Sequence, residues 1–438
     1  MPTVGIESVG SYVPGYRLAG SLAAELGGAA DLPLCAPDED ALTLSAEALR
    51  TLPGSAPRDR VALRTTSGAE PRAALAHLAA TGGVDDPCVV LPLAAESGAP
   101  ALLAMAAGLR AQIAVVADHG RPADPAASPA PDGAVALRFG SPDAAAILHS
   151  ESLHTLAFDR WTDGSTEDPE DPRFIEETLL ASDGTELLDC LCAGAGVTPG
   201  DLAGVVLNCV VPVRADRWAE RWKVSRVWTP GPPERQAGRL AAATLRTTFE
   251  RLADAGPGAL VAVLDLAWGG DAVLLRAGDR VADTVHVTRR PATAEYGYRD
   301  WLRSATPSGQ GIWTSPAKLR REVPGLLRLT GSRCTACECV TFPGAATCEM
   351  CGAAEVAAHP LARHGTVLSH NVDRLFAAPE REVQMIVVEL DGGGRFFGQS
   401  VAAPRRWASV GDTVRLSLRR LHSGGGRPHY FWKVDLDD

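Results

Sequence analysis

Hydrophobic and polar positions alternate along residues 1–290 in two repeating patterns. Short runs of β-branched and apolar residues indicate strands, and longer alanine-rich segments with helical spacing indicate helices between them. The expected strands lie at 59–66, 86–93, 111–118, 134–140, 144–150, 204–211 and 259–268, and the expected helices at 40–52, 101–111, 172–195 and 238–255. Strands that alternate with helices predict an α/β layered domain with buried sheets. Two glycine-punctuated regions, around Gly98 and in LDLAWGGDAVLL, suggest an internal duplication.

The pattern changes after residue 290. Residues 291–325 mix helix formers with proline and glycine and predict a connecting arm. A cysteine-rich stretch follows, and five short strand patterns come after it at 365–374, 382–390, 394–401, 412–421 and 429–436. Five short strands in so few residues predict a small β-barrel of the OB type. The predicted domains are therefore 1–290, the arm 291–325, a zinc ribbon at 326–355 and the barrel at 356–438.

The cysteine-rich stretch GSRCTACECVTFPGAATCEMCG contains two C-x-x-C pairs. Cys334 and Cys337 form one pair, and Cys348 and Cys351 form the other. Two such turns that face each other satisfy the tetrahedral preference of Zn²⁺. Four thiolates fill the coordination shell, so the predicted zinc site is structural and contributes folding energy rather than catalysis. Cys339 lies beside the cluster and is not expected to be a ligand.

Composition narrows the classes of function. The chain of 438 residues is 46% hydrophobic and carries a net charge of −11, which argues against nucleic acid as a partner. The N-terminus lacks a signal-peptide pattern, and no apolar run is long enough to span a membrane, so the expected location is cytoplasmic. Cysteines in metal spacing also fit a reducing compartment. The last third contains the arginines Arg405, Arg406, Arg419 and Arg420. These side chains could bind an anionic ligand, but a position on solvated strand edges is the commoner explanation.

Residues 91–109, LPLAAESGAPALLAMAAGL, read as the end of a buried strand, a tight turn and a helix. Enzymes place nucleophiles on such turns, because the helix start supplies backbone amides and positive dipole to stabilise an anion. Glu96 and Ser97 occupy this turn.

Several stretches of the first domain together carry a family resemblance. They are VGIESVGSYVPGYRL, DEDALTLSAEALRTL, the turn described above, PDGAVALRF, FDRWTDGSTEDPEDPRF, GRLAAATLRTTFERL and AEYGYRDWLR. With these stretches the domain resembles the thiolase superfamily of condensing enzymes, in the branch of ketoacyl-acyl-carrier-protein synthase III and hydroxymethylglutaryl-CoA synthase. The C-terminal part resembles the zinc-ribbon and OB-fold module that accompanies thiolases. The resemblance implies a layered αβαβα first domain, followed by a rubredoxin-like zinc ribbon and the barrel.

In the family that the chain resembles, a cysteine at a helix start takes the acyl group, and a histidine and an asparagine support carbanion formation. Here Glu96 stands where the resemblance implies the cysteine, Asn208 stands in place of the histidine, and Arg239 stands in place of the asparagine. All three are replaced, so cysteine-based Claisen condensation is not expected.

Two interpretations of the predicted pocket remain. In the first, Glu96 is neutral or paired with Arg239, and the pocket has lost its chemistry. In the second, Glu96 is a general base on an acyl thioester, with Asn208 as oxyanion donor and Arg239 binding a carboxylate or phosphate. Acyl transfer through Ser97 is a further alternative that would need an adjacent base.

These interpretations lead to two hypotheses of function. The first is a non-condensing member of the acyltransferase family that binds acyl-CoA or acyl carrier protein, with a CoA or phosphopantetheine thioester as ligand, as a component of an acyl-transfer complex. The resemblance implies a homodimer or a thiolase-like partner protein, and the alanine, glycine and arginine bias suggests specialised metabolism. The second is an enzyme that uses Glu96 for decarboxylation, an aldol step or carbon–carbon cleavage.

Other candidate residues have ordinary explanations beside the functional ones. His119 follows a strand end and could line a cleft, and His286 is expected to face outward from a strand. Trp218, Trp222 and Trp228 lie among basic residues that could contact CoA or a carrier protein, although an amphipathic helix packed on the domain surface explains them as well.

Overall fold

The computed structural model describes seventeen stretches of the chain. They are residues 4–20, 32–53, 60–65, 78, 89–93, 98–119, 131–153, 176–209, 213–231, 240–266, 270–292, 294–296, 315–374, 382–402, 404, 406–424 and 427–436. Among these residues, no helix combines the length and the apolar character that crossing a bilayer requires.

Ten of the eleven strands of the large sheet in the first domain form two halves of five strands each, and the eleventh, β12, pairs with β1. In chain order the first half contains β1 (Val4–Val13), β3 (Arg60–Thr65), β4 (Val89–Pro92), β5 (Ile113–Asp118) and β6 (Gly133–Gly140). The second contains β7 (Ala145–Leu153), β8 (Gly204–Cys209), β9 (Val227–Trp228), β10 (Leu260–Leu266) and β11 (Gly270–Ala277). The sheet runs β4-β3-β5-β6-β1 and continues β7-β11-β10-β8-β9. Counted in chain order within its half, each half runs from the outer edge inward as third, second, fourth, fifth and first strand. The two halves share one strand order, so the fold is internally duplicated.

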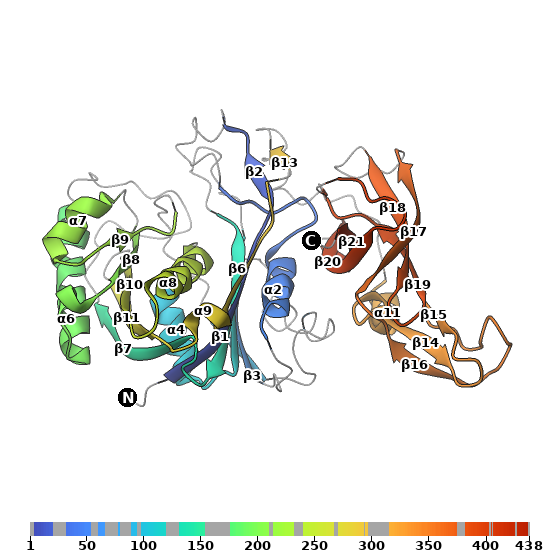
Figure 1. Cartoon of the computed structure of the whole chain (residues 1–438), viewed down its shortest axis with the longest axis horizontal. Helices are drawn as coiled ribbons and strands as arrows, with labels where there is room; N and C mark the ends of the chain where they lie inside the picture. The colour runs from blue at the N-terminus through green and yellow to red at the C-terminus, as the bar shows by residue number, and fades with distance from the viewer. Residues whose placement is uncertain are drawn as a thin grey trace.

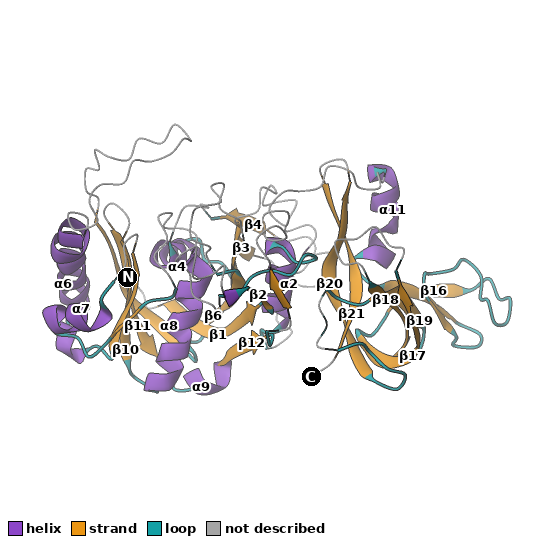
Figure 2. Ribbon diagram, turned by 90° about the horizontal axis from the view of Figure 1, so that it is seen from above, coloured by secondary structure: helices purple, strands orange, loops and turns teal. Residues whose placement is uncertain are grey.

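Helices separate and cover the two half-sheets. α4 (Ala99–Gly108) and α8 (Ala241–Ala255) lie between the halves. α4 packs on β10 and β11 of the second half, and α8 packs on β5 and β6 of the first half as well as on β8 and β10 of its own half. α2 (Ala41–Arg50) covers the outer face of the first half, and α6 (Gly184–Ala195) covers that of the second (Figures 1 and 2). This arrangement confirms the predicted αβαβα layers.

Two of the predicted helices have an end that a local sequence signal marks, the start of α2 and the end of α6. Asp40 caps α2 through hydrogen bonds from the backbone amides of Leu42 and Thr43, and Thr43 completes a capping box. α6 ends at Gly196 with a positive φ of 71°, which glycine adopts without strain. The shorter elements of this domain are β2 (Tyr16–Leu18), the π-helix η1 (Glu176–Asp183), the 3₁₀-helix η2 (Pro199–Asp201), α7 (Ala215–Trp222), α9 (Val281–Thr284), β12 (Val285–Arg289) and β13 (Ala294–Tyr296).

The C-terminal part contains a helix and two small sheets. α11 (Pro316–Leu326) precedes the three strands of the ribbon, which are β14 (Thr330–Cys334), β15 (Val340–Thr341) and β16 (Val356–Pro360). The second sheet has the order β19-β18-β17-β20-β21 and consists of β17 (His364–Asp373), β18 (Val383–Leu390), β19 (Arg395–Gln399), β20 (Thr413–Gly424) and β21 (Arg427–Leu436). A bridge between Ser400 and Val434 brings its two ends together. The five predicted strands and the barrel-like sheet are thus confirmed.

Candidate functional site

The structure describes one of the three predicted pocket residues. Glu96 and Arg239 lie outside the described residues, and so does Ser97. Asn208 lies near the end of β8 and is buried. Glu96 was predicted just before α4 and Arg239 just before α8. The structure describes these two helices with the residues that precede them directly, Gly98 and Leu240.

Asn208 pairs with a carboxyl group that the sequence analysis did not identify. The two strands β8 and β10 are parallel, and their register places Asn208 directly beside Asp265. The side-chain amide of Asn208 donates a hydrogen bond of 3.2 Å to Oδ2 of Asp265. The predicted oxyanion donor is therefore engaged with a buried carboxyl group of its own chain.

The carboxyl group of Asp265 lies against the start of α4. The backbone N–H of Ala99 donates a hydrogen bond to it, and a Cβ atom added to Gly98 would lie 1.8 Å from Oδ2. α4 has no cap from the side chain of its own N-terminal residue, Gly98. Asp265 of the second half therefore occupies the anion-binding end of a helix from the first half.

Burial raises the pKa of Asp265 to about 7, although the hydrogen bonds from Asn208 and Ala99 oppose the shift. Such a carboxyl group gains and loses its proton near neutral pH, which is the range in which general acids and bases operate. The arrangement is therefore able to hold or move a proton at Asp265.

The first half contains the equivalent pair. Arg64, on the second strand of that half, forms a buried ion pair with Asp118, on the fourth strand. The backbone N–H of Ala242 in α8 donates a hydrogen bond of 2.6 Å to Asp118. Burial raises the pKa of Asp118 to about 6 against the effect of Arg64. Each half thus provides a carboxyl group to the start of the helix that belongs to the other half.

The two pairs are electrostatic neighbours, because the charge of Arg64 also lowers the pKa of Asp265. Sequence reasoning missed Arg64, Asp118 and Asp265. A signal was present, since each interrupts or ends an otherwise apolar strand pattern, in RVALRT, IAVVAD and LVAVLDL, and buried charges are rare unless they are paired.

The four predicted zinc ligands come together in the ribbon. Their sulfur atoms form one cluster, with Cys334 3.6 Å from Cys351 and Cys337 3.5 Å from Cys348. Tetrahedral Zn–S bonds of about 2.3 Å separate two sulfurs by about 3.8 Å, so the cluster fits a zinc ion. Backbone amides of Cys351 and Met350 lower the pKa of the Cys348 thiol to about 6, whereas hydrogen bonds among the sulfur atoms raise the pKa of Cys337 and of Cys351. A bound cation would stabilise all four as thiolates.

The structure gives the remaining candidates different surroundings. His286 is exposed on β12, as predicted. Trp218 and Trp222 are buried on the inner face of α7, so the packing explanation holds for these two, and Trp228 is half-buried on β9. His119 lies directly after β5, with its Nδ1 3.5 Å from a carboxylate oxygen of Asp132.

One expectation about the last third is wrong. Arg419 was expected on a solvated strand edge, but it is buried, with 1% of its side chain exposed. It contacts Glu47 of α2 at 2.9 Å and Glu39 at 3.3 Å. Arg406 does remain exposed, paired with Asp412, and Arg420 donates a hydrogen bond to the backbone oxygen of Pro37. Sequence spacing could not show that β20 packs against the first domain.

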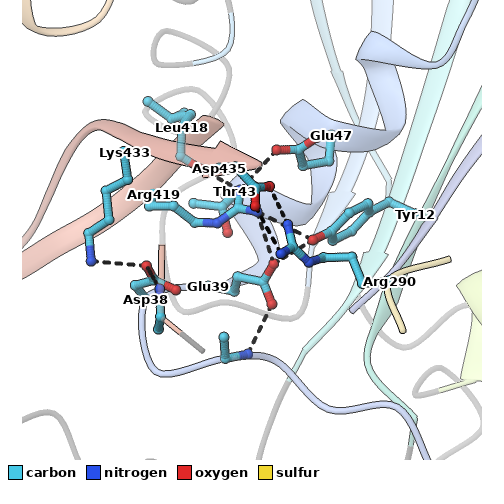
Figure 3. Close-up of polar contacts among 12 residues, drawn as sticks. Tyr12, Asp38, Glu39, Thr43, Glu47, Arg290, Leu418, Arg419, Lys433 and Asp435 are labelled. Atoms are coloured by element: carbon cyan, nitrogen blue, oxygen red, sulfur yellow. Dashed lines mark hydrogen bonds and ion pairs between the residues drawn. The ribbon is translucent and has the colours of Figure 1, made fainter. Parts of the chain in front are cut away.

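Arg419 belongs to a buried ionic interface between the barrel and the first domain (Figure 3). From the first domain, Glu47 also contacts Arg415, Asp38 contacts Lys433 at 2.9 Å, and Arg290 pairs with Asp435. The residues of this interface are Tyr12, Asp38, Glu39, Glu47, Arg290, Arg415, Arg419, Lys433 and Asp435. Beside it a cavity of about 400 Å³ is lined by residues that include Tyr16, Val401 and Trp407.

Comparison with known proteins gives one family model and several solved structures. A model described as the ChsH2 rubredoxin-like zinc ribbon domain matches residues 321–357. This match confirms the predicted zinc ribbon. No curated protein sequence matches the chain.

The solved structures include both branches of condensing enzymes that the sequence resembles. 3-Oxoacyl-[acyl-carrier-protein] synthase III from Aquifex aeolicus VF5 is 18% identical, with a TM-score of 0.44 over 62% of this chain and 99% of that one. An HMG-CoA synthase complexed with CoA is 12% identical, with a TM-score of 0.49 over 70% and 91%. AbyA1, a tetronic acid condensing enzyme, is 16% identical, with a TM-score of 0.45 over 63% and 100%.

Proposed function

We propose that the chain is a non-condensing relative of the condensing acyltransferases that binds acyl-CoA or acyl carrier protein within an acyl-transfer complex in the cytoplasm. The observation that carries the proposal is the carboxyl group of Asp265 at the start of α4, in contact with Gly98 and hydrogen-bonded to the N–H of Ala99. A helix start stabilises a thiolate or an oxyanion only where its amides are available. Here a carboxyl group of the chain itself uses one of them.

The sequence of the turn supports the same proposal. Glu96 and Ser97 stand where the resemblance implies an acyl-accepting cysteine. A carboxylate is a poor nucleophile toward a thioester, and its product would be a reactive mixed anhydride. Glu96 in the sequence and Asp265 in the structure together support a helix start that does not transfer acyl groups through a thiol.

The zinc ribbon and barrel support a role in binding and assembly. The four-thiolate cluster gives the ribbon its own folding energy, and the buried ionic interface fixes the barrel to α2. We expect a homodimer or a thiolase-like partner. Within the described part of the sheet β4 is an outer edge, and exposed strand edges pair with other chains.

Acyl-CoA probes test this function directly. Purified full-length chain is titrated with acetyl-CoA and malonyl-CoA by calorimetry, and is then analysed for released CoA and for a gain in mass. We expect binding without CoA release and without an acyl adduct. An adduct on the peptide that contains Ser97, abolished by Ser97→Ala, would replace the proposal with acyl transfer through serine.

A second function is favoured by the pKa of Asp265, which lies at about 7. In this function Asp265 or Glu96 is a general base on a bound thioester, for decarboxylation or an aldol-type step. The test is turnover of malonyl-CoA by the Glu96→Ala and Asp265→Asn variants, with the exposed Asp254→Asn in α8 as the control. Turnover by the natural chain that falls by about 100-fold or more in either variant, but not in the control, would establish the second function and overturn the first.

A further inference from the structure

A second cluster of metal-binding side chains lies in the first domain, away from the zinc ribbon. Cys35, His119 and Asp132 each offer a ligand atom, and these three atoms lie within 4.8 Å of one another. They come from three separate segments, namely the loop before α2, the end of β5 and the residue before β6. Cys35 and Asp132 are buried, and 19% of the His119 side chain is exposed.

Backbone hydrogen bonds hold the cluster in place. The N–H of Cys35 donates to Oδ2 of Asp132 at 2.7 Å, and the N–H of Asp132 donates to the backbone oxygen of Pro33 at 2.8 Å. The other carboxylate oxygen, Oδ1, faces Nδ1 of His119 at 3.5 Å. The loop that carries Cys35 is thus fixed to Asp132, and His119 lies next to the other edge of the same carboxylate.

The geometry of Cys35, His119 and Asp132 fits a metal site and does not fit a catalytic triad. In a Cys-His-Asp triad the thiol and the carboxylate bind opposite nitrogens of the imidazole, so the ring lies between them. Here the sulfur of Cys35 and an oxygen of Asp132 are also within 4.8 Å of each other. The three ligand atoms form a triangle rather than a line. In addition, Cys35 is 0% exposed, which shields its sulfur from an acyl substrate but not from an ion held among the three side chains.

We propose that Cys35, His119 and Asp132 form a second metal site, which binds zinc or another divalent transition metal of similar softness. One sulfur, one nitrogen and one oxygen are a ligand set that Zn²⁺ accepts in tetrahedral geometry. A thiolate, a carboxylate and a neutral imidazole balance the charge of a divalent ion. Three protein ligands, as found among the described residues, leave one position for water or a substrate atom, which is the arrangement of a reactive zinc rather than a closed structural one.

Metal stoichiometry of the full-length chain tests this proposal independently of the proposed function. The protein is saturated with Zn²⁺, freed of excess ion, and its zinc is measured by mass spectrometry. We expect two zinc ions per chain, and one in Cys35→Ser and in His119→Ala. Cys192→Ser, which changes a buried cysteine outside both clusters, should retain two, and Cys348→Ser should lose only the ribbon ion.

Cobalt titration locates the second ion. Co²⁺ at a site with one thiolate gives a weaker sulfur-to-metal charge-transfer band than the four-thiolate ribbon, and this weaker band should disappear in Cys35→Ser. His119→Ala should lower the affinity for Zn²⁺ by at least about tenfold, the loss that even outer partners of metal ligands cause. Because His119 is partly exposed, this variant is expected to fold if Cys35→Ser does not. One zinc ion in the natural chain, or two in folded His119→Ala, would overturn the proposal.

Discussion

Two buried aspartates, Asp118 and Asp265, link the two halves of the duplicated domain. Each lies on the fourth strand of its half and accepts a hydrogen bond from the first turn of the helix that belongs to the other half. Burial raises the pKa of both, to about 6 for Asp118 and about 7 for Asp265. Their partners differ, because Asp118 pairs with the permanent cation of Arg64, whereas Asp265 accepts hydrogen bonds from two neutral groups, the amide of Asn208 and the backbone N–H of Ala99. This difference makes Asp265 the carboxyl group better suited to exchange a proton.

The pH dependence of stability should report the raised pKa of Asp265. The folded chain keeps this proton between about pH 4 and pH 7, where the unfolded chain has already lost it, so folding is favoured at the acid end of that window and weakens as pH rises. Asp265→Asn removes the titration. The free energy of unfolding of the variant, relative to the natural chain, should therefore increase by about 4 kcal/mol from pH 4 to pH 8.

The measurement is denaturant unfolding of both proteins at several pH values, with Asp254→Asn as the control, because Asp254 is exposed. Parallel pH curves for Asp265→Asn and the natural chain would show that the carboxyl group of Asp265 is not protonated in the folded state.

Residue types were predictable from the sequence, but residue partners were not. The four zinc ligands were predictable from their spacing alone, because each C-x-x-C turn supplies two ligands and a tetrahedral zinc ion needs both turns. Asn208 was identified, but its partner Asp265 lies 57 residues away and becomes its neighbour only through the register of β8 and β10. Glu96 and Arg239 remain predictions, since they lie outside the described residues.

At the scale of elements, the start of α4 depends on the absence of a side chain at Gly98. Its φ of −74° and ψ of 174° suit any residue, so the requirement for glycine is steric and not conformational. A Cβ atom there would lie 1.8 Å from Oδ2 and 2.4 Å from Cγ of Asp265. The strand and the helix therefore approach each other only because position 98 is glycine.

Gly98→Ala should destabilise the fold by about 1–3 kcal/mol, the usual cost of forcing an additional carbon into a packed site. Gly108→Ala at the other end of α4 is a matched control, because a Cβ atom there meets nothing within 4 Å. The control should be neutral, or stabilising by up to about 1 kcal/mol, since alanine favours helix over glycine. Thermal unfolding of both variants measures the difference. Equal stability would contradict the close approach of Asp265 to α4.

The sequence pattern predicted the order of strands and helices along the chain better than it predicted which helix covers which sheet. Alternating strand and helix patterns predicted an α/β domain, and α2, α4 and α8 lie where the periodicity places them. The contacts of α4 and α8 with the opposite half were not predictable, because both helices are rich in alanine and the apolar positions of a helix do not specify which sheet it covers. The duplication became clear only from the common strand order.

At the scale of the whole molecule, the barrel is bound to the first domain by charges and by a shared core. Apolar residues of α2, such as Leu44 and Leu49, belong to the same buried cluster as Leu418 and Trp432 of the barrel. Buried ion pairs stabilise little over an apolar interface, but the loss of one partner leaves an unpaired charge without solvent. The main effect of the ionic interface is therefore to specify one position of the barrel on the first domain, and its contribution to stability is smaller.

Glu47→Gln tests this docking. Glu47 lies between Arg415 and Arg419 at 3.2 and 2.9 Å, and these cations hold its pKa well below the ordinary range. A carboxylate with a lowered pKa stabilises the fold at pH values above about 4.3, its unfolded pKa, and this contribution disappears as pH falls. At neutral pH the glutamine variant leaves Arg419 with Glu39 as its remaining close carboxylate, and should lose about 3–5 kcal/mol.

The comparison variant is Glu389→Gln, which changes an exposed glutamate on β18 and should alter stability by less than about 0.5 kcal/mol. Unfolding of Glu47→Gln is followed at neutral pH and again near pH 3, where the deficit should shrink because Glu47 of the unfolded natural chain is then protonated and folding has to release that proton. Small-angle scattering of the folded variant at neutral pH reports whether the barrel separates from the first domain. A variant as stable as the control at neutral pH would mean that the apolar contacts of α2 alone hold the barrel in place.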